Sequence, residues 1–282
     1  MESLIARKTW RTLEPIHGMI YFVPEAEAEY MHLGVTLQRT GYFASRAAPM
    51  GAVNADVVIS TFYNFNPALV RAAMVGAWEI APPSEFTKVR FRAVDAALRR
   101  AWGDDVVCSS EVHELASLLR RIAEVACEKP EGRPLFAGHS SVPWPDQPHL
   151  VLWHAQTLLR EFRGDGHIAA LTTEGLSGIE ALVSHAASGE VPAQALTSSR
   201  SWSDEEWRSA IDGMRGRGLV TKSGDLAFTP AGNEQRKRIE ATTDALATAP
   251  YAAFGEKVCE KIRELGRPLS KAILEAGLLP LR

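Results

Sequence analysis

Cysteine is scarce in this chain, and its scarcity excludes two kinds of stabilising site. The three cysteines, Cys108, Cys127 and Cys259, are widely spaced and form no Cys-x-x-Cys pair. Neither a disulfide framework nor a thiolate zinc site is predicted, because both need cysteines paired at short spacings. We expect free thiols that pack as small apolar side chains in a reducing compartment.

Long apolar runs and an excess of one charge are also missing. No stretch reaches the roughly 18 apolar residues of a membrane span, and residues 1–10 show no secretory signal. The formal net charge of −3 gives no general attraction to nucleic acid or to anionic lipid. These absences predict a cytoplasmic protein without a membrane partner.

The common cofactor and nucleophile motifs are absent as well. The sequence contains neither Gly-x-Gly-x-x-Gly nor the Walker pattern Gly-x-x-x-x-Gly-Lys-Ser/Thr, and it has no Gly-x-Ser-x-Gly elbow. The familiar nucleotide-dependent enzymes and serine hydrolases are therefore largely excluded. We expect no cofactor, with a divalent metal as the less favoured alternative.

The sequence does contain strong helical periodicity. Apolar residues recur at spacings of three and four within residues 85–103, 111–129 and 148–164, and little alternates with a period of two before residue 219. The predicted fold class is therefore mainly α. We expect a multi-helical ligand-binding or catalytic domain over residues 1–195 and a smaller module over residues 196–282.

A faint internal repeat relates two segments of the first domain. A shift of 93 residues places residues 43–70 over residues 136–163, so that Arg46 matches His139. Both segments begin Phe-Ala, pass through a proline-containing loop and enter an apolar helix. If this match is a duplication rather than chance, two helical halves present equivalent loops to a shared cleft.

The last third of the chain reads as helix, short hairpin and helix. Ser203 and Glu206 form a capping box at the start of the first helix, and Pro230 suits the first turn of the second. Between them, two short apolar stretches, Leu-Val and Leu-Ala-Phe, flank the turn Lys-Ser-Gly-Asp. This pattern predicts a small β-hairpin. The order Arg-Gly-Leu-Val, turn, Leu-x-x-Thr-x-x-Gly resembles the winged helix-turn-helix of MarR-type transcription regulators.

The whole chain also resembles an actinobacterial family of mostly helical proteins of unassigned function that end in such a module. The resemblance rests on residues 41–51 (GYFASRAAPMG), 62–65 (FYNF) and 159–167 (LREFRGDGH), together with the C-terminal module. It implies a MarR-like winged helix with a closing helix over residues 196–282. It brings no settled activity with it.

The resemblance to regulators raises the question of DNA binding. In such modules the helix before the wing lies in the major groove. Here that helix begins Ser203-Asp204-Glu205-Glu206, and three carboxylates weaken binding to a polyanion. We therefore favour packing or homodimerisation through the winged-helix region, and a MarR-like transcription regulator is the third hypothesis for function.

The densest group of reactive side chain types lies within residues 154–167. His154 and Glu161 share one helix face, and the glycines of Arg-Gly-Asp-Gly-His can end the helix and fold Asp165 and His167 back toward it. The alternative is an ordinary helix end, in which Gly164 is the C′ residue and Asp165 caps the next helix. The sequence leaves these two interpretations balanced.

The leading hypothesis is a protein that binds a small organic molecule, as a sensor or a sequestering protein. Arg46 would hold an acidic group bidentately while aromatic rings cover the apolar body of the ligand. The alternative for this loop is that its aromatic rings simply fill the core. The predicted ligand-binding residues are Tyr42, Phe43, Arg46, Phe62, Tyr63, Asn64, Trp144 and His154.

The rival hypothesis is an enzyme of small-molecule, secondary metabolism that is cofactor-independent or metal-assisted. Its predicted catalytic residues are Glu161, Arg163, Asp165 and His167. His167, oriented by Asp165, would act as the general base, and Arg163 would stabilise developing charge. In the metal-assisted form His154, Glu161 and His167 would be the ligands, although their spacing is not diagnostic. The sequence does not identify the ligand or substrate.

Overall fold

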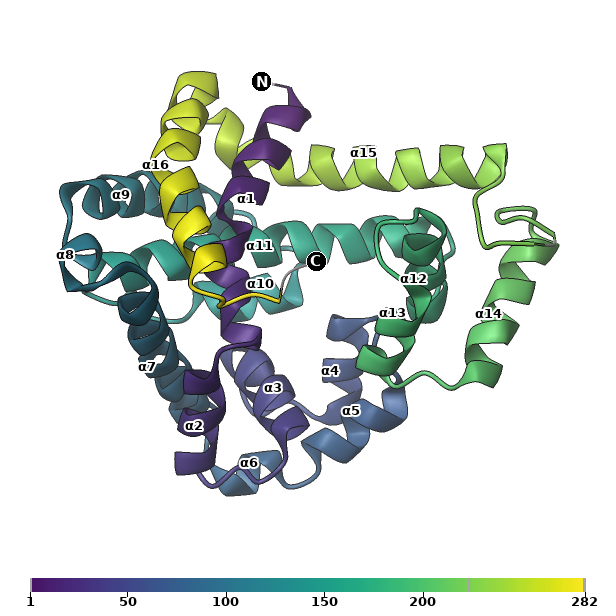
Figure 1. The fold of residues 1–282 in the computed structure, drawn as a ribbon, viewed down its shortest axis with the longest axis horizontal. Helices are drawn as coiled ribbons and strands as arrows, with labels where there is room; N and C mark the ends of the chain where they lie inside the picture. The colour runs from purple at the N-terminus through teal and green to yellow at the C-terminus, as the bar shows by residue number, and fades with distance from the viewer. Residues whose placement is uncertain (1, 223, 281–282) are drawn as a thin grey trace. The chain divides into compact units, whose positions relative to one another are not determined.

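The computed structural model describes residues 2–222 and 224–280 (Figure 1). The chain forms two compact units, and each unit combines segments that are distant in the sequence. Unit 1 comprises Met1–Val53, Gly76–Asp165 and Asp244–Arg282, and unit 2 comprises Asn54–Val75 and Gly166–Thr243. The expected boundary between residues 195 and 196 falls within unit 2.

Unit 1 is built from helices around a single apolar core. α1 packs along α16, where Gly266 allows a close approach, since a β-carbon there would lie 2.3 Å from Cδ2 of Leu13 and force that side chain to move. Its elements are α1 (Ser3–Gly18), η1 (Met19–Tyr21), α2 (Pro24–His32), α3 (Gln38–Ala47), η2 (Ala48–Met50), α6 (Ala77–Ile80), α7 (Pro83–Trp102), α8 (Asp104–Val107), α9 (Ser110–Cys127), α10 (Pro134–Ser140), α16 (Gly255–Glu275) and the adjoining parts of α11 (Pro148–Thr173) and α15 (Pro230–Ala252).

The helical part of the fold prediction is confirmed by α7 and α9, which cover the expected residues. α7 begins at Pro83, whose fixed φ suits a first helical turn, and it ends at Gly103, whose φ is 79°. Ser109 caps α9 by accepting a hydrogen bond from the Val112 amide. Local signals and apolar spacing were sufficient to place these helices.

α11 corrects the prediction of a helix end near Gly164. The helix continues through Arg-Gly-Asp-Gly-His to Thr173, so Gly164 is not a C′ residue and Asp165 caps no following helix. A glycine inside a helix costs only about 1 kcal/mol relative to alanine. The side chains of Phe162, Arg163 and Asp165 are all buried, and this tertiary packing outweighs the helix-breaking tendency of the glycines.

Unit 2 contains a second, smaller core that includes Leu182, Leu196, Trp207 and Met214. Its helices are α4 (Ala55–Phe62), α5 (Pro67–Met74), α12 (Gly178–Ala187), α13 (Ala193–Arg200), α14 (Asp204–Gly216) and the remaining parts of α11 and α15. A three-residue turn joins α13 to α14, with residue 201 in the left-handed region at φ 58°. We call these two helices and their turn the α13–α14 segment. Ser203 and Glu206 form the predicted capping box at the start of α14.

The predicted β-hairpin, and with it the wing, is wrong. Residues 2–222 and 224–280 contain no β-strand, and residues 219–229 contribute one isolated antiparallel bridge between Val220 and Phe228. The apolar stretches that flank the turn are only two and three residues long, too short for a ladder of strand pairs. Thr229 instead accepts from the Gly232 amide and starts α15, so the segment is a loop between helices.

No part of the described chain has the form of a membrane-spanning helix, since each helix is too short or too polar to cross a bilayer. The three cysteines are free thiols, with Cys108 exposed and Cys259 buried.

Candidate functional site

Arg46 lies in the interior of unit 1, on the last turn of α3. Its Nη1 donates to the hydroxyl of Tyr42 one turn earlier, at 2.6 Å, and its Nη2 lies 3.5 Å from Oε1 of Glu161. The guanidinium also lies over the rings of Tyr21 and Tyr42, 5.1 and 5.3 Å from their centroids. Phe43 is fully buried and packs edge-on against Tyr42. The structure therefore brings together three predicted ligand-binding residues from α3 with Glu161 from α11.

Glu161 is the carboxylate that the buried Arg46 and the half-buried Arg160 share. Its Oε1 lies 3.0 Å from Nη1 of Arg160 as well as 3.5 Å from Arg46, and Arg160 also pairs with Glu14 at 2.9 Å. Burial raises the pKa of Glu161, but the charges of Arg160 and Arg46 outweigh burial and hold that pKa below its ordinary value. Glu161 is therefore ionised at neutral pH, and Arg46 and Arg160 share its negative charge.

Arg90, on α7, is a buried cation that lacks such a partner. Only 3% of it is exposed, and its Nη2 lies 3.4 Å from the Tyr21 hydroxyl. Its guanidinium stacks over the rings of Tyr21 and Trp153, at 5.5 and 5.4 Å. Its Nε has no hydrogen-bond partner, and no carboxylate of the described residues forms an ion pair with it. Glu161 feels the charge of Arg90 only at longer range.

These side chains form a group with unbalanced charge. We call Arg46, Arg90, Arg160, Glu14 and Glu161 the arginine cluster, because it contains three guanidinium groups and two carboxylates. A charge removed from water needs an opposite charge and hydrogen bonds to offset its desolvation. The cluster therefore has one positive charge more than its own carboxylates balance.

The histidines around the cluster do not add to this charge. Burial lowers the pKa of His17 well below its ordinary value, and burial lowers the pKa of His139 to about 3. His17 sits between Thr157 and Tyr21, with its ring nitrogens 2.8 and 2.7 Å from their hydroxyls, and stacks on Trp153. Both imidazoles are neutral at pH 7, so the surplus belongs to the arginines.

His154, on α11, lies among aromatic side chains. Its ring packs against Trp144 at 4.8 Å and Phe91 at 5.7 Å, and burial lowers its pKa to about 4. A hydrogen bond to the backbone of Val142 opposes this lowering in part, and the side chain is only 1% exposed. Together with Arg90 and Trp153, His154 lines a cavity of about 10 Å³ in unit 1.

The catalytic residues predicted on α11 do not form an acid–base pair. Asp165 accepts a hydrogen bond from the Phe136 amide at 2.9 Å within unit 1, and burial raises its pKa to about 7. His167 pairs with the Thr243 hydroxyl at 2.9 Å within unit 2. Residues two apart on a helix point to different sides. Asp165 therefore does not orient His167, and the predicted catalytic dyad is not assembled.

Arg163 also has a partner of its own. Its Nη1 lies 2.8 Å from Oδ1 of Asp244 on α15, and its guanidinium lies over the ring of Trp10. This buried pair joins three helices of unit 1. Arg163 is thus placed as an ion-pairing residue, separate from the Arg46–Glu161 pair.

The aromatic run at residues 62–65 belongs to unit 2. Phe62 is buried, and the Tyr63 hydroxyl donates to the carbonyl of Leu176. The Asn64 carbonyl accepts from Nε1 of Trp202 at 2.9 Å. Gly178 packs so closely on this segment that a β-carbon there would lie 1.9 Å from the Tyr63 carbonyl oxygen. These residues hold the segment between α4 and α5 within unit 2 and lie outside the arginine cluster.

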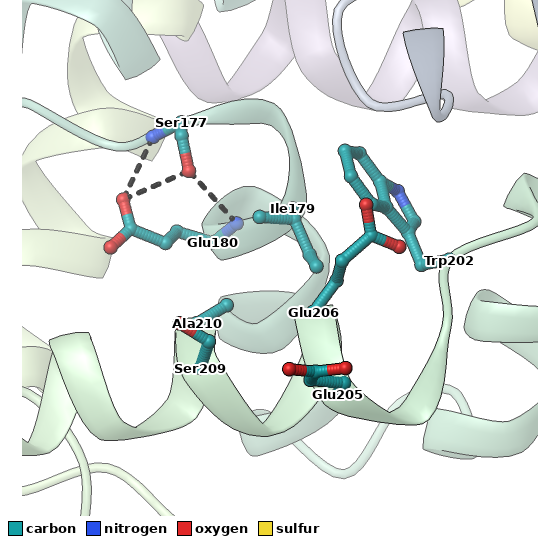
Figure 2. Close-up of a pocket in the computed structure, with 8 residues that line it drawn as sticks. All are labelled: Ser177, Ile179, Glu180, Trp202, Glu205, Glu206, Ser209 and Ala210. Carbon is teal, nitrogen blue, oxygen red and sulfur yellow. Dashed lines mark hydrogen bonds between the residues drawn. The ribbon is translucent and has the colours of Figure 1, made fainter. Parts of the chain in front are cut away.

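A surface groove of about 460 Å³ runs along the start of α14 in unit 2 (Figure 2). Two of its carboxylates are already used: Glu206 closes the capping box and accepts from Asn66, and Glu180 caps Ser177 and pairs with Arg217. The lining residues are Ser177, Ile179, Glu180, Trp202, Glu205, Glu206, Ser209 and Ala210. The groove is open and acidic, with most of its polar groups engaged in local structure.

α14 buries one face and exposes the other. Trp207 and Met214 pack into the core of unit 2, while Asp204, Glu205 and Arg208 are exposed. The Arg208 Nε donates to the Asp204 carbonyl of the same helix. The exposed face therefore carries carboxylates in its first turn and an arginine that is already engaged.

Sequence reasoning missed Arg90, His139 and Trp153. Arg90 lies four residues after Phe86 and four before Val94, so it is a charged residue within the buried apolar stripe of α7. That position was the available signal, because an unpaired charge inside a buried stripe is rare. His139 matched Arg46 in the internal repeat, and both side chains act on Glu161.

The predicted metal ligands lie apart. His154 is in its aromatic environment, Glu161 is between arginines, and His167 is in unit 2. Within residues 2–222 and 224–280, no three histidine, cysteine or acidic side chains gather in a way that could hold a metal ion.

Comparison with known proteins gives one finding. A family model described as a helix-turn-helix family matches residues 6–280, nearly the whole chain. No curated protein and no solved structure matches the chain. The prediction of a helix-turn-helix protein is thereby confirmed, while the description specifies neither MarR-type regulators nor an organism.

Proposed function

The chain belongs to the helix-turn-helix family, and from that premise we propose that it binds a small acidic organic molecule inside unit 1. The observation that carries this proposal is the surplus positive charge of the arginine cluster. Arg90 is buried and has no carboxylate partner among the described residues. An acidic ligand would supply the missing negative charge in a site from which water is largely excluded.

The surroundings of the cluster suit an organic acid better than an inorganic ion alone. Tyr21, Tyr42 and Trp153 flank the guanidinium groups with ring faces. Binding sites for small molecules combine such apolar walls with a few polar groups that fix the orientation of the ligand. The acidic group would meet the arginines, and the apolar body would lie against apolar side chains next to these rings, such as Phe91, which packs edge-on against Trp153.

The helix-turn-helix family also bears on the use of the ligand. The second helix of such a module normally meets DNA, but the exposed first turn of α14 carries Asp204, Glu205 and Glu206. These carboxylates oppose contact with phosphates. We therefore propose a sensor or sequestering protein in which α14 contributes little to DNA affinity, rather than a strong DNA-binding regulator.

A ligand screen by thermal unfolding tests the proposal. Small monocarboxylic acids and their neutral amides are compared at constant pH and ionic strength, so that only the charge of the ligand differs. A ligand at 100 times its Kd adds about 2.7 kcal/mol, which corresponds to a rise in Tm of about 5 °C or more. The proposal fails if no acid raises Tm more than its own amide does.

A further inference from the structure

We propose that the acidic group of this ligand binds in the small cavity beside Arg90, and that the ligand is a short-chain monocarboxylate. In this site Arg90 is the counterion, and Trp153 donates to a carboxylate oxygen. The inference rests on the proposed function and adds to it a location and a ligand class.

The cavity has a buried polar floor and a half-buried apolar rim. Arg90, His139 and His154 form the floor, and each is less than 5% exposed. Phe91 and Val142 contribute to the rim and are only partly buried. The volume of about 10 Å³ is roughly the room needed for one water-sized group. A carboxylate head is larger than this space, so its binding requires side chains of the half-buried rim to move apart, and a large anion would require a larger rearrangement.

Two residues that line this cavity carry unsatisfied polar atoms. The Nε of Arg90 and the Nε1 of Trp153 are buried without a hydrogen-bond partner. Such atoms are rare in folded proteins, and each costs about 1–3 kcal/mol when left unpaired. Arg90 and Trp153 each offer an N–H group. A carboxylate accepts several hydrogen bonds and donates none, so it matches this set of donors.

The positive charge of Arg90 favours a carboxylate over a water molecule as the occupant of the cavity. Water could satisfy individual N–H groups, but it brings no charge to offset that of Arg90. Glu161 cannot take this role, because Arg46 and Arg160 already share its Oε1. Burial lowers the pKa values of His139 and His154 to about 3 and 4, so without a ligand neither ring adds a positive charge to that of Arg90.

The rim limits the length of the ligand. Phe91 and Val142 offer apolar contacts at the half-buried side, and Trp144 packs on His154 behind them. A chain of one to three carbons gives a methyl or ethyl group that these side chains can cover. The class is therefore formate, acetate, propionate and similar acids.

Acetate is the probe, and acetamide is its neutral counterpart. The wild-type protein is titrated with each at fixed ionic strength, and affinity is measured by calorimetry and by the rise in Tm. Arg90→Met removes the proposed counterion and keeps an apolar side chain in the buried stripe. Arg92→Met, on the exposed side of the same helix, is the matched control, because Arg92 pairs with Glu29 at the surface.

The wild type and Arg92→Met are expected to bind acetate equally, and Arg90→Met to bind it at least tenfold more weakly. Without acetate, Arg90→Met should be as stable as the wild type, because it removes an unpaired buried charge. Should Arg90→Met fail to fold, the indole N–H signal of Trp153 in the wild type, assigned with Trp153→Phe, reports on the cavity directly. That signal is expected to shift with acetate and not with chloride.

Three results overturn the inference. The first is acetate or a longer acid that binds Arg90→Met as tightly as the wild type. The second is acid binding that leaves the Trp153 signal unchanged. Both of these leave the proposed function standing. The third is equal binding of acetamide and acetate, because the cavity would then have no requirement for charge. If no acid binds the wild type at all, the proposed function falls together with the inference.

Discussion

Charged side chains lie inside the helical core of unit 1, whereas they lie on the surface of the α13–α14 segment in unit 2. Arg90 and Glu161 are less than 5% exposed, but Asp204 and Glu205 are exposed to solvent. Water stabilises the surface charges at little cost, while the buried charges depend on one another. The same residue types therefore form an interdependent buried group in one unit and shape the surface potential in the other.

The contrast between buried and exposed charges also bears on two hypotheses, ligand binding by unit 1 and DNA binding by α14. A buried and unbalanced cluster has a strong requirement for one counterion in one place. The exposed carboxylates in the first turn of α14 are solvated, so their free energy depends only weakly on neighbouring charges. Substitutions that remove one partner of a buried ion pair in unit 1 should therefore have large effects on stability, and substitutions of exposed charges in α14 should have small ones.

The largest effect is expected for Glu161→Gln. The variant keeps the shape of the side chain but leaves Arg46 and Arg160 without the carboxylate they share. Loss of one partner from a buried ion pair typically costs about 3–5 kcal/mol. The free energy of unfolding, measured by urea denaturation, should fall by this amount.

The matched control for Glu161→Gln is Glu205→Gln on the exposed face of α14, which should change stability by less than about 0.5 kcal/mol. Similar losses for the two variants would break the comparison, because they would show that burial does not distinguish the charges of the two units.

Asp165 gives the next largest effect, through pH. Burial raises its pKa to about 7 in the folded chain, above the ordinary value of 3.8. A raised carboxyl pKa means that the unfolded chain ionises first. The favourable contribution is complete below pH 3.8 and is lost as the pH rises through about 7.

Asp165→Asn keeps an acceptor for the Phe136 amide but cannot ionise. Relative to the wild type, it should therefore gain about 2–4 kcal/mol of stability between pH 4 and pH 8. Chemical denaturation at both pH values measures this gain. Asp212→Asn on α14 serves as the exposed control, and an equal gain in that variant would count against an effect of burial.

The fold could be predicted where local signals and tertiary packing agree. The spacing of apolar residues placed α7 and α9, and the Ser203–Glu206 capping box placed the start of α14. Glycine spacing misplaced the end of α11, because the packing around Asp165 overrides an intrinsic preference of about 1 kcal/mol. The β-hairpin failed for the opposite reason, since its flanking segments are too short to pair.

The candidate site could be predicted only in part. Arg46 and Tyr42 lie one turn apart in sequence, so their contact was accessible to helical geometry. The contact with Glu161 depends on the packing of α3 against α11, which periodicity does not specify. In the sequence, Arg90 stood out only as a charged residue within the apolar stripe of α7. Its lack of a counterion could be recognised only when every carboxylate around it had been placed.

The smallest expected effect concerns the exposed charges on the surface of α14. Wild-type protein should bind a random DNA duplex weakly, because the first turn of α14 presents carboxylates to the phosphates. Glu205→Lys reverses one of these charges at an exposed position. If that turn approaches DNA, the variant should steepen the slope of log K against log salt concentration by about 1.

Fluorescence anisotropy with a labelled duplex between 50 and 200 mM salt measures the slope. Asp105→Lys, at an exposed position of α8 in unit 1, changes the net charge by the same amount and is the control. A steeper slope in Glu205→Lys alone would show that the α13–α14 segment faces DNA and that its native carboxylates weaken the contact. Equal slopes in both variants would mean that DNA responds only to net charge. The acidic face of α14 would then have no special relation to nucleic acid, which is the outcome that a ligand-binding or sequestering protein predicts.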